Sequence, residues 1–426
     1  METAARYQRL VEGLYGLRRF GVRLGLDNIR GLLRRVGDPQ RTFRSVHIAG
    51  TNGKGSVAAM VEAILRGAGN RVGLFTSPHL VSFTERIQID RKRTSEREIL
   101  DLYDAIRPHL EEMASAGEGG QATFFEVTTA LACMAFRAAG VDWAVMETGL
   151  GGRLDATNVL DPEICLITGI DFDHMEYLGD TLESIAREKA GILKRDVPAI
   201  AVRQRPEVES VLLAAAGERG ARLSFADPAT LAPVSADLMG QVFQWHGREW
   251  RLRLVGEHQL SNALLALAAS ETLASKDARI DDAVRGRALA GVDWPGRFQV
   301  IGDDPIVVLD GAHNPAGVTA LVRCFRQHVG HGPCNLIFSA LSDKAVDEMV
   351  MLLAPLAGWL AVVPVASSRS IRPGAVLKLF EAANPHCESR AFQDFRAAWD
   401  ARPAGRPTLV TGSLFLVGEA LELLRD

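Results

Sequence analysis

Short apolar runs alternate along the chain with longer segments in which apolar residues recur every three or four positions. Alternation of this kind is typical of a mostly parallel sheet covered by helices on both faces. Predicted strands in the first part of the chain are residues 43–48, 72–75, 143–147, 164–170 and 199–202, and predicted helices begin at Val57 and cover residues 124–139, 182–193, 259–274 and 281–290.

A stretch with Gly and Pro at residues 291–296 predicts a linker between two domains. Before it, residues 242–245 and 250–254 flank a His-Gly-Arg-Glu turn, which predicts a hairpin at an antiparallel edge of the sheet. A second alternating series follows the linker, with predicted strands near residues 306–309, 335–339, 360–363 and 408–411. We therefore predict an α/β protein, with a doubly wound, mostly parallel sheet in residues 1–295 and a smaller Rossmann-like domain in residues 296–426. Residues 114–121 are predicted to form a loop.

The composition and charge of the chain indicate which classes of molecule it can bind. The chain has 426 residues, of which 47% are hydrophobic and 23% charged, and its formal net charge is −4. This length favours two domains, and this charge offers no basic surface for nucleic acid or anionic lipid. No apolar leader and no segment that could span a membrane is visible, so we expect a cytoplasmic monomer that acts on small molecules. The five cysteines lie scattered, which indicates buried thiols rather than a disulfide framework.

A glycine-rich turn between the first predicted strand and helix carries the strongest chemical signal. Its backbone N–H groups would face phosphate at a helix N-terminus, as in a P-loop domain, and its residues are Thr51, Asn52, Gly53, Lys54, Gly55 and Ser56. Lys54 would reach the terminal phosphates, and the Ser56 hydroxyl would bind magnesium. The common pattern G-x-x-x-x-G-K-[ST] is not met, because Ile48 replaces its first glycine and Gly55 is inserted before Ser56. The alternative is a glycine-rich turn without a ligand.

Three polar residues follow further predicted strands, where open α/β sheets place their ligands. Glu147 ends an apolar strand and precedes a Gly-Leu-Gly-Gly turn, so its carboxylate either holds Mg²⁺ or caps that turn. His174, in Asp-Phe-Asp-His, is a candidate metal or phosphate contact, although a lone histidine is more often structural. Ser77 precedes Pro78 and either joins the metal ligands or caps a turn.

Four charged or titratable residues have weaker local signals. Lys189 lies near the end of a predicted helix, where a lysine more often interacts with the helix dipole than takes part in catalysis. Asp310 and His313 lie on a strand-to-helix turn, from which they could reach across a domain cleft. Arg297 directly follows the linker, so it either contacts phosphate when the domains close or is a solvated linker charge.

The ordered set of motifs resembles the folylpolyglutamate synthase and dihydrofolate synthase family, a branch of the Mur ligase superfamily. The resemblance runs from about residue 24 to residue 417 through GTNGKGS, SPHL, FTERI, FFE, ETGLGGRLDATN, DHMEYLG, REKAGI, LSNALLA, GRFQ, LDGAHNP and TGSLFLVG. It includes the unusual Lys-Gly-Ser insertion. The resemblance implies an ATP- and Mg²⁺-dependent ligase that adds L-glutamate to dihydropteroate and to the γ-carboxylate of folates through an acyl phosphate.

The resemblance also implies roles for individual residues. Catalysis would involve Lys54, Lys189 and His313, and ATP would be bound by the loop from Thr51 to Ser56 with Asn262, Arg297 and Asp310. Magnesium would be held by Ser56, Ser77, Glu147, His174 and Lys189. The family's lysine at this position is carbamylated, which reverses the local interpretation of Lys189. Substrate contacts would be Val22, Arg23, Leu24, Thr123, Phe124, Phe125, Glu126, Leu154, Asp155 and Ala156.

Three other functions compete with this interpretation. A P-loop ATPase switch would need the phosphate loop and Glu147, but neither a pterin pocket nor the Asp310 and His313 pair. A cell-wall Mur ligase would carry a nucleotide-sugar domain before the loop, and the chain ahead of Lys54 is too short for one. The nearest alternative is a monofunctional folylpolyglutamate synthase. The motifs FTERI, FFE and LDATN favour an enzyme with both ligase activities.

Overall fold

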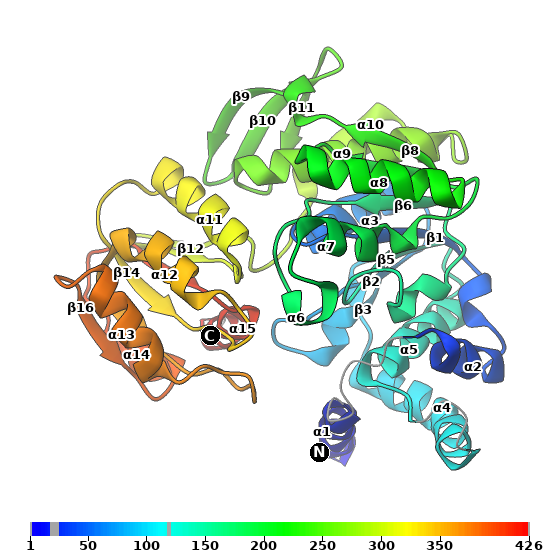
Figure 1. Ribbon diagram of the computed structural model, residues 1–426, viewed down its shortest axis with the longest axis horizontal. Coiled ribbons are helices and arrows are strands. Elements are labelled where there is room, and N and C mark those ends of the chain that lie inside the picture. Colours follow the sequence, from blue (N-terminus) through cyan, green and yellow to red (C-terminus); the bar gives the residue numbers. More distant parts are fainter. Residues whose placement is uncertain (1, 18–24, 117–120, 425–426) are drawn as a thin grey trace.

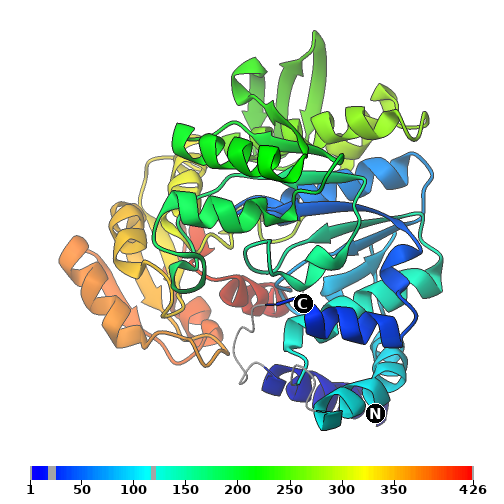
Figure 2. The same ribbon diagram turned by 45° about the vertical axis from the view of Figure 1, so that its right-hand side comes forward.

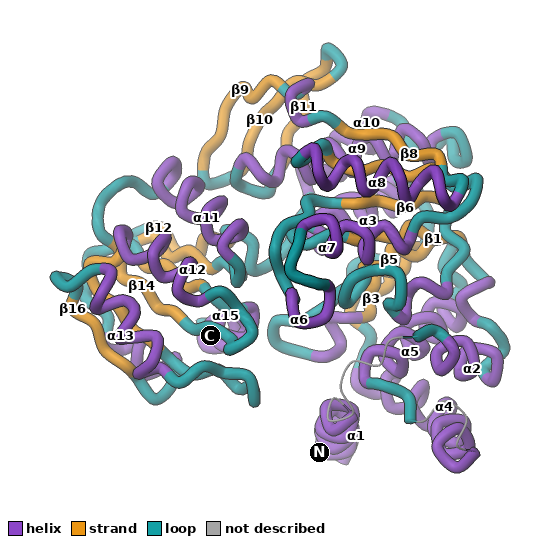
Figure 3. Tube along the Cα trace, viewed as in Figure 1, coloured by secondary structure: helices purple, strands orange, loops and turns teal. Residues whose placement is uncertain are grey.

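The computed structural model describes residues 2–17, 25–116 and 121–424. Within these residues, two α/β domains lie side by side, the larger on an eight-stranded sheet and the smaller on a six-stranded one (Figure 1). A separate three-stranded sheet belongs to the larger domain (Figure 3). The predicted fold class is confirmed.

The main sheet of the larger domain is parallel except at one edge. Its strand order is β4-β3-β2-β5-β1-β6-β7-β8, and the pairs β2–β3 and β3–β4 are antiparallel. The strands are β1 (Arg44–Ala49), β2 (Val72–Phe75), β3 (Ile87–Ile89), β4 (Lys92–Arg93), β5 (Trp143–Glu147), β6 (Ile164–Ile167), β7 (Pro198–Val202) and β8 (Arg222–Ala226). The carboxyl ends of β1, β5 and β6 therefore lie next to one another, and the loops that follow them can form one site.

Helices cover both faces of this sheet, because its central strands are apolar on both sides. One face packs on α3, α9 and α10, and the other packs on α1, α2, α4 and α5 with α7 and α8. The helices are α1 (Glu2–Gly16), α2 (Asp27–Arg35), α3 (Lys54–Gly67), α4 (Glu96–Ala116), α5 (Phe124–Ala139), α6 (Met175–Leu178), α7 (Leu182–Lys189), α8 (Pro206–Arg219), α9 (Glu257–Ala274) and α10 (Asp282–Gly291). In the described part of the chain, no helix is both long and apolar enough to cross a membrane.

The predicted hairpin exists, but the prediction that it forms an edge of the main sheet is wrong. Strands β10 (Gly240–Trp245) and β11 (Arg248–Leu252) pair antiparallel and join β9 (Ala232–Asp237) in their own sheet. The hairpin's apolar side chains, Phe243 among them, pack into the core that contains α9. The main sheet ends at β8 instead.

The smaller domain is a parallel sheet with one antiparallel edge strand. Its order is β12-β13-β17-β14-β15-β16, and β12–β13 is the antiparallel pair. Its elements are β12 (Gln299–Asp303), β13 (Ile306–Leu309), α11 (Pro315–His328), β14 (Cys334–Phe338), α12 (Val346–Leu353), β15 (Ala357–Val362), α13 (Pro373–Ala383), β16 (Glu388–Ala391), α14 (Phe395–Ala401), β17 (Thr408–Thr411) and α15 (Leu414–Leu423). Figure 2 shows α15, in red, facing the larger domain, where Gly418 packs against the carbonyl of Leu80.

Two predicted boundaries differ from the structure for physical reasons. β6 ends at Ile167 and not at residue 170, because the carbonyl of Gly169 leaves the sheet to accept hydrogen bonds from the N–H groups of Thr51 and Asn52. The loop predicted at residues 114–121 starts later, because α4 continues to Ala116. Residues 117–120 lie outside the described part.

His47, buried in β1, predicts a pH-dependent stability. Its Nε2 lies 2.8 Å from the Thr157 hydroxyl, and burial lowers the pKa of its imidazole to about 3. Unfolded histidine has a pKa of about 6.5, so between these values the unfolded chain binds a proton that the folded chain does not. Stability should therefore fall as pH drops below about 6.5, by up to about 1.4 kcal/mol per pH unit from this group.

The measurement is urea unfolding between about pH 7.5 and about pH 5, in the wild type and in His47→Gln. The variant should lose less stability over this range, whatever its stability at neutral pH. Equal slopes in the two proteins would contradict the prediction.

Candidate active site

The glycine-rich turn lies between β1 and α3, at the carboxyl edge of the main sheet. The helix begins at Lys54, so this residue and Ser56 lie in its first turn. The Lys54 ammonium folds back and donates to the carbonyls of Gly50 and Thr51, each at 3.1 Å. The loop therefore has the predicted strand-to-helix geometry, and its cation is held near the phosphate-binding position by neutral acceptors.

Asn262, on α9, lies directly against this loop. A Cβ atom at Gly53 would come within 2.3 Å of the Asn262 Oδ1, and Gly53 has a φ of 91°. Glycine is therefore required there both for the left-handed backbone and for the close approach of the asparagine. The Asn262 amide donates to the Gln259 side chain at 3.0 Å, which fixes its orientation.

The Lys54 ammonium lies among three of the predicted metal ligands. Burial raises the pKa of Glu147, and Lys54 is the strongest of the charges that oppose this rise. The pKa of Lys189 is lowered to about 7 and that of His174 to about 4, chiefly by burial, and the charge of Lys54 contributes to both shifts. Lys189 is 4% exposed and donates to the carbonyl of Gly50 at 2.8 Å. The structure thus brings these residues together around one positive charge.

Ser77, which follows the end of β2, also lies beside Glu147. Its backbone N–H donates to the Glu147 Oε2 at 3.1 Å. Ser56 is buried in the first turn of α3. Among the described residues, no three His, Cys, Asp or Glu side chains cluster as metal ligands. A site here would therefore depend on hydroxyls and on Lys189 in addition to Glu147 and His174.

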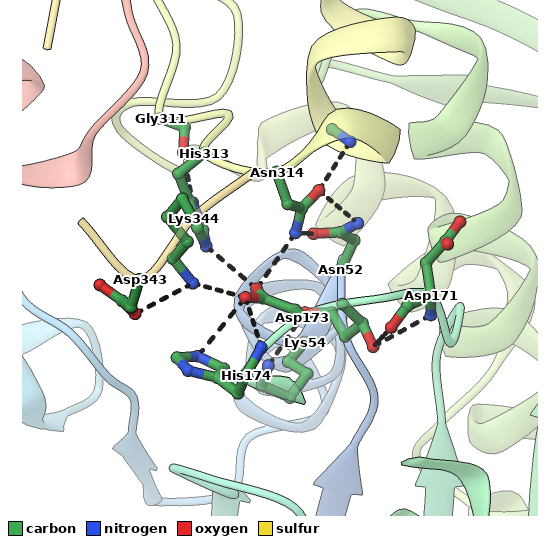
Figure 4. Close-up of polar contacts among 12 residues, drawn as sticks. Asn52, Lys54, Asp171, Asp173, His174, Gly311, His313, Asn314, Asp343 and Lys344 are labelled. Atoms are coloured by element: carbon green, nitrogen blue, oxygen red, sulfur yellow. Dashed lines mark hydrogen bonds and ion pairs between the residues drawn. The ribbon is translucent and has the colours of Figure 1, made fainter. Parts of the chain in front are cut away.

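Asp173 joins the two domains (Figure 4). Its carboxylate accepts from Lys344 at 2.5 Å and from Asn314 at 3.2 Å, and it lies 3.6 Å from the His313 Nε2. All three partners come from the smaller domain. Burial opposes ionisation of Asp173, but His313, the adjacent His174 and Lys344 outweigh it and hold the pKa of the carboxyl well below its usual range.

A second contact ties the phosphate loop itself to the smaller domain. The side-chain amides of Asn52 and Asn314 donate to each other, at 3.2 and 3.0 Å. Asn314 also caps α11, because its Oδ1 accepts from the N–H of Gly317 at 2.8 Å. The start of α11 is thereby fixed to the loop at residues 51–56.

His313 and Arg297 face the larger domain, whereas the Asp310 oxygens are held by backbone N–H groups of the smaller domain. His313 donates from Nδ1 to the carbonyl of Gly311 at 2.8 Å, which leaves Nε2 turned toward Asp173. Arg297 lies near enough to Glu147 to lower its pKa. The two oxygens of Asp310 accept instead from the N–H groups of Phe298 and Ala312 in its own domain, at 2.7 and 2.8 Å. This carboxylate therefore links the residue before β12 to the turn after β13, and its contact with ATP across the cleft stays a prediction.

A cavity of about 550 Å³ opens between the domains beside this network. Ser77, His174 and His313 line it, and so do the predicted substrate contacts Thr123, Phe124, Phe125, Glu126, Leu154, Asp155 and Ala156. The smaller domain adds Lys344, Ser367, Ser368, Arg369 and Ser413. The predicted contacts Val22, Arg23 and Leu24 lie outside the described residues.

Two of the lining carboxylates also hold the backbone of the cavity wall. Glu126 and Thr123 form a capping box at the start of α5, with Thr123 N–H donating to the Glu126 Oε2 at 2.7 Å. Asp155 accepts from the N–H groups of Gly149 and Leu150 at 2.8 and 2.9 Å. Burial raises the pKa of Asp155, and these hydrogen bonds oppose that rise. Binding of substrate by either carboxylate stays a prediction.

Comparisons with known proteins agree with this architecture. The family model of the Mur ligase middle domain matches residues 48–270, and that of the Mur ligase, glutamate ligase domain matches residues 296–414. A dihydrofolate synthase/folylpolyglutamate synthase of Bacillus subtilis is 34% identical over 427 residues, which cover 98% of this chain and 99% of the relative. The chain belongs to the folylpolyglutamate synthase and dihydrofolate synthase family of Mur ligases.

Solved structures of this Mur ligase family superpose over nearly the whole chain. Mycobacterium tuberculosis folylpolyglutamate synthase, complexed with ADP and AMPPCP, has a TM-score of 0.90 and 36% identity and covers 100% of this chain and 99% of its own. A bifunctional folylpolyglutamate synthase/dihydrofolate synthase of Yersinia pestis, complexed with AMPPNP and a Mn ion, has a TM-score of 0.83 and 30% identity, covering 99% and 98%. These proteins are similar in both domains and in their arrangement.

Asp173 and Lys344, whose ion pair joins the two domains at this Mur ligase site, were not among the predicted site residues. Asp173 immediately precedes His174, and Lys344 follows β14 in a Ser-Asp-Lys turn. Polar residues beyond the carboxyl ends of parallel strands are the signal that identified Glu147. The same rule, applied to the smaller domain, would have identified Lys344.

Proposed function

We propose that this chain is an ATP-dependent ligase that adds L-glutamate to dihydropteroate, forming dihydrofolate, and to the γ-carboxylate of folates. One observation carries the proposal: predicted metal ligands, predicted pterin contacts and His313 of the smaller domain line a single interdomain cavity. The relatives support the reaction class, because their names state these activities and their structures bind ADP or ATP analogues.

The acceptor carboxylate must first become electrophilic. Transfer of the γ-phosphoryl group of ATP to a carboxylate oxygen gives an acyl phosphate and ADP. We assign the phosphates to the backbone of residues 51–56 and to Lys54, which would exchange its two carbonyl acceptors for phosphate oxygens. Arg297 would stabilise the charge that develops during transfer. Asn262 and Asp310 complete the proposed ATP site, Asp310 by holding the turn that follows Arg297.

The residues proposed for magnesium suit a hard divalent cation, because most of their donor atoms are oxygens. The proposed ligands are Ser56, Ser77, Glu147, His174 and a carbamate on Lys189. Burial raises the pKa of the Glu147 carboxyl, so a neighbouring cation would stabilise its anion. When bound, Mg²⁺ would neutralise charge on the phosphoryl group. The Mn ion in the Yersinia pestis protein supports a divalent metal with ATP.

The amine of L-glutamate then attacks the acyl carbon, loses its proton, and phosphate leaves. Water must be excluded meanwhile, because it would hydrolyse the acyl phosphate, and a site between two closing domains provides that exclusion. His313 is the proposed catalytic group of the smaller domain. Its hydrogen bond to Gly311 orients the ring so that Nε2 faces the cleft.

We also propose that the chain divides into domains at residues 1–295 and 296–426. We further propose that the protein is a cytoplasmic monomer without nucleic acid or membrane partners. The alternative to two activities is a monofunctional folylpolyglutamate synthase.

The test is ADP release from ATP, Mg²⁺ and L-glutamate, with dihydropteroate and tetrahydrofolate offered separately. Both acceptors should support ADP release and yield a product larger by one glutamate, detected by mass spectrometry. Turnover with tetrahydrofolate but not with dihydropteroate would replace the proposal by the monofunctional alternative. Turnover with neither would refute it.

A further inference from the structure

A tryptophan of the interdomain linker lies against the phosphate loop. A Cβ atom at Gly55 would come within 3.0 Å of the Trp294 Nε1 and 3.1 Å of its Cζ2. Gly55 is helical and is not among the residues with a positive φ, so its backbone does not require glycine. Glycine weakens a helix relative to alanine. The structure therefore gives a steric reason for the glycine inserted after Lys54, because a larger residue there would contact the indole.

Arg91, in the turn between β3 and β4, holds this tryptophan in place. Its guanidinium carbon lies 5.2 Å from the centre of the Trp294 ring, and its Nη2 donates to the carbonyl of Asp293 at 2.6 Å. Arg91 adopts a φ of 65°, which a non-glycine residue seldom does. It interacts electrostatically with Glu62, which is fully buried on α3. Glu62 lies about two helical turns after Gly55, on the same face of α3.

The other end of the linker is attached to the smaller domain. Gly296 has a φ of 71°, and its carbonyl accepts from the N–H of Gly311 at 2.9 Å and from the Arg297 Nη1 at 3.0 Å. Only Pro295 and Gly296 separate Trp294 from Arg297. The position of the Arg297 guanidinium is therefore set by two anchors, one on the phosphate-loop helix and one on the turn after β13.

We propose that Trp294 is a positioning residue that couples the phosphate loop to Arg297. The indole holds the linker on the first turn of α3, so that the loop and the arginine take up their ATP-binding positions together. This inference rests on the proposed function, because it assumes that Arg297 acts on ATP. The inference also explains Gly55, the residue inserted relative to the common phosphate-loop pattern, because the absence of a side chain there leaves room for the linker tryptophan.

The test is a double-mutant cycle with Gly55→Ala and Trp294→Ala, read as kcat/KM for ATP. Gly55→Ala in the wild type should push the indole away and lower kcat/KM about tenfold. In the Trp294→Ala background the same methyl group meets no indole, and its effect should be less than about twofold. Equal losses in the two backgrounds would mean that Gly55 serves the nucleotide directly, and would overturn the proposal.

A positioning role also predicts which kinetic constants change. Trp294→Ala should raise KM for ATP and lower kcat, leave KM for the folate acceptor within about twofold, and leave the melting temperature nearly unchanged because the side chain is half-buried. Trp294→Phe should recover part of the loss. Proportional loss in every constant together with a lower melting temperature would indicate a merely structural side chain and contradict the proposal.

Intrinsic fluorescence gives an independent readout. Binding of ADP to the wild type should change tryptophan emission, and Trp294→Phe should abolish that change while Trp399→Phe, on α14 of the smaller domain, retains it. A change that persists in Trp294→Phe would count against the contact. Failure of the wild type to release ADP from ATP with L-glutamate and either acceptor would instead refute the proposed function, so the two failures are distinguishable.

Discussion

Lys189→Ala should lower kcat for ligation on the order of 100- to 1000-fold, which corresponds to loss of one charge-stabilising contact to the transferring phosphoryl group. The reason is the environment of the amine. Burial lowers the pKa of Lys189 to about 7, so a large fraction of the amine is neutral at physiological pH and can add CO₂ to form a carbamate. The carbamate would convert a buried cation next to Lys54 into an anion that suits Mg²⁺.

Two variants make this prediction specific. Lys189→Arg keeps a positive charge but cannot be carbamylated, so it should be as inactive as Lys189→Ala. Formate or acetate, as small carboxylates, should restore part of the activity of Lys189→Ala. Lys194→Ala serves as the control, because Lys194 is a partly buried lysine whose ammonium donates to the carbonyl of Asn158 and does not face Lys54. Full activity of Lys189→Arg would exclude the carbamate.

Local sequence signals predicted most elements of the larger domain. α5 is confirmed at residues 124–139 because Thr123 and Glu126 form a capping box that a sequence displays directly, and Gly140 ends the helix with a φ of 60°. β5 is confirmed at residues 143–147 because an apolar run on a doubly covered sheet is continuous. The substrate segments at residues 123–126 and 154–156 also line one cavity as a set.

Contacts between the domains were not predictable in the same way. Asp173 and Lys344 are 171 positions apart, and no local pattern links them. Asp310 is a further case, because its strand-end position is typical of ligand contacts, yet its oxygens accept from the backbone N–H groups of Phe298 and Ala312 in its own domain. A position at the end of a strand identifies a candidate ligand-binding residue. The hydrogen-bond partners of the side chain in the folded protein then decide whether it can contact a ligand.

The second large effect is expected for the hydrogen bonds and ion pairs that join Asp173 to the smaller domain. The substitution Asp173→Asn should separate the two domains. The substitution removes the closer carboxylate partner of the Lys344 ammonium, which is 5% exposed, and leaves it only Asp343 at 3.9 Å. Breaking a buried pair costs up to about 3–5 kcal/mol. His313 loses its nearest anion at the same time. We expect a larger radius of gyration in small-angle X-ray scattering and a loss in kcat of about 100-fold, because the cleft no longer excludes water.

Asp171→Asn is the matched control for this experiment. Asp171 lies two positions earlier, but its carboxylate is 3.6 Å from Arg205 within the larger domain. This variant should keep the wild-type radius of gyration. Adding Lys344→Met to Asp173→Asn should recover part of the lost free energy of unfolding, because it removes a buried charge that has lost its closer partner. If Asp173→Asn keeps both the wild-type radius and the wild-type kcat, the domains are held by the Asn52 and Asn314 amides and not by Asp173.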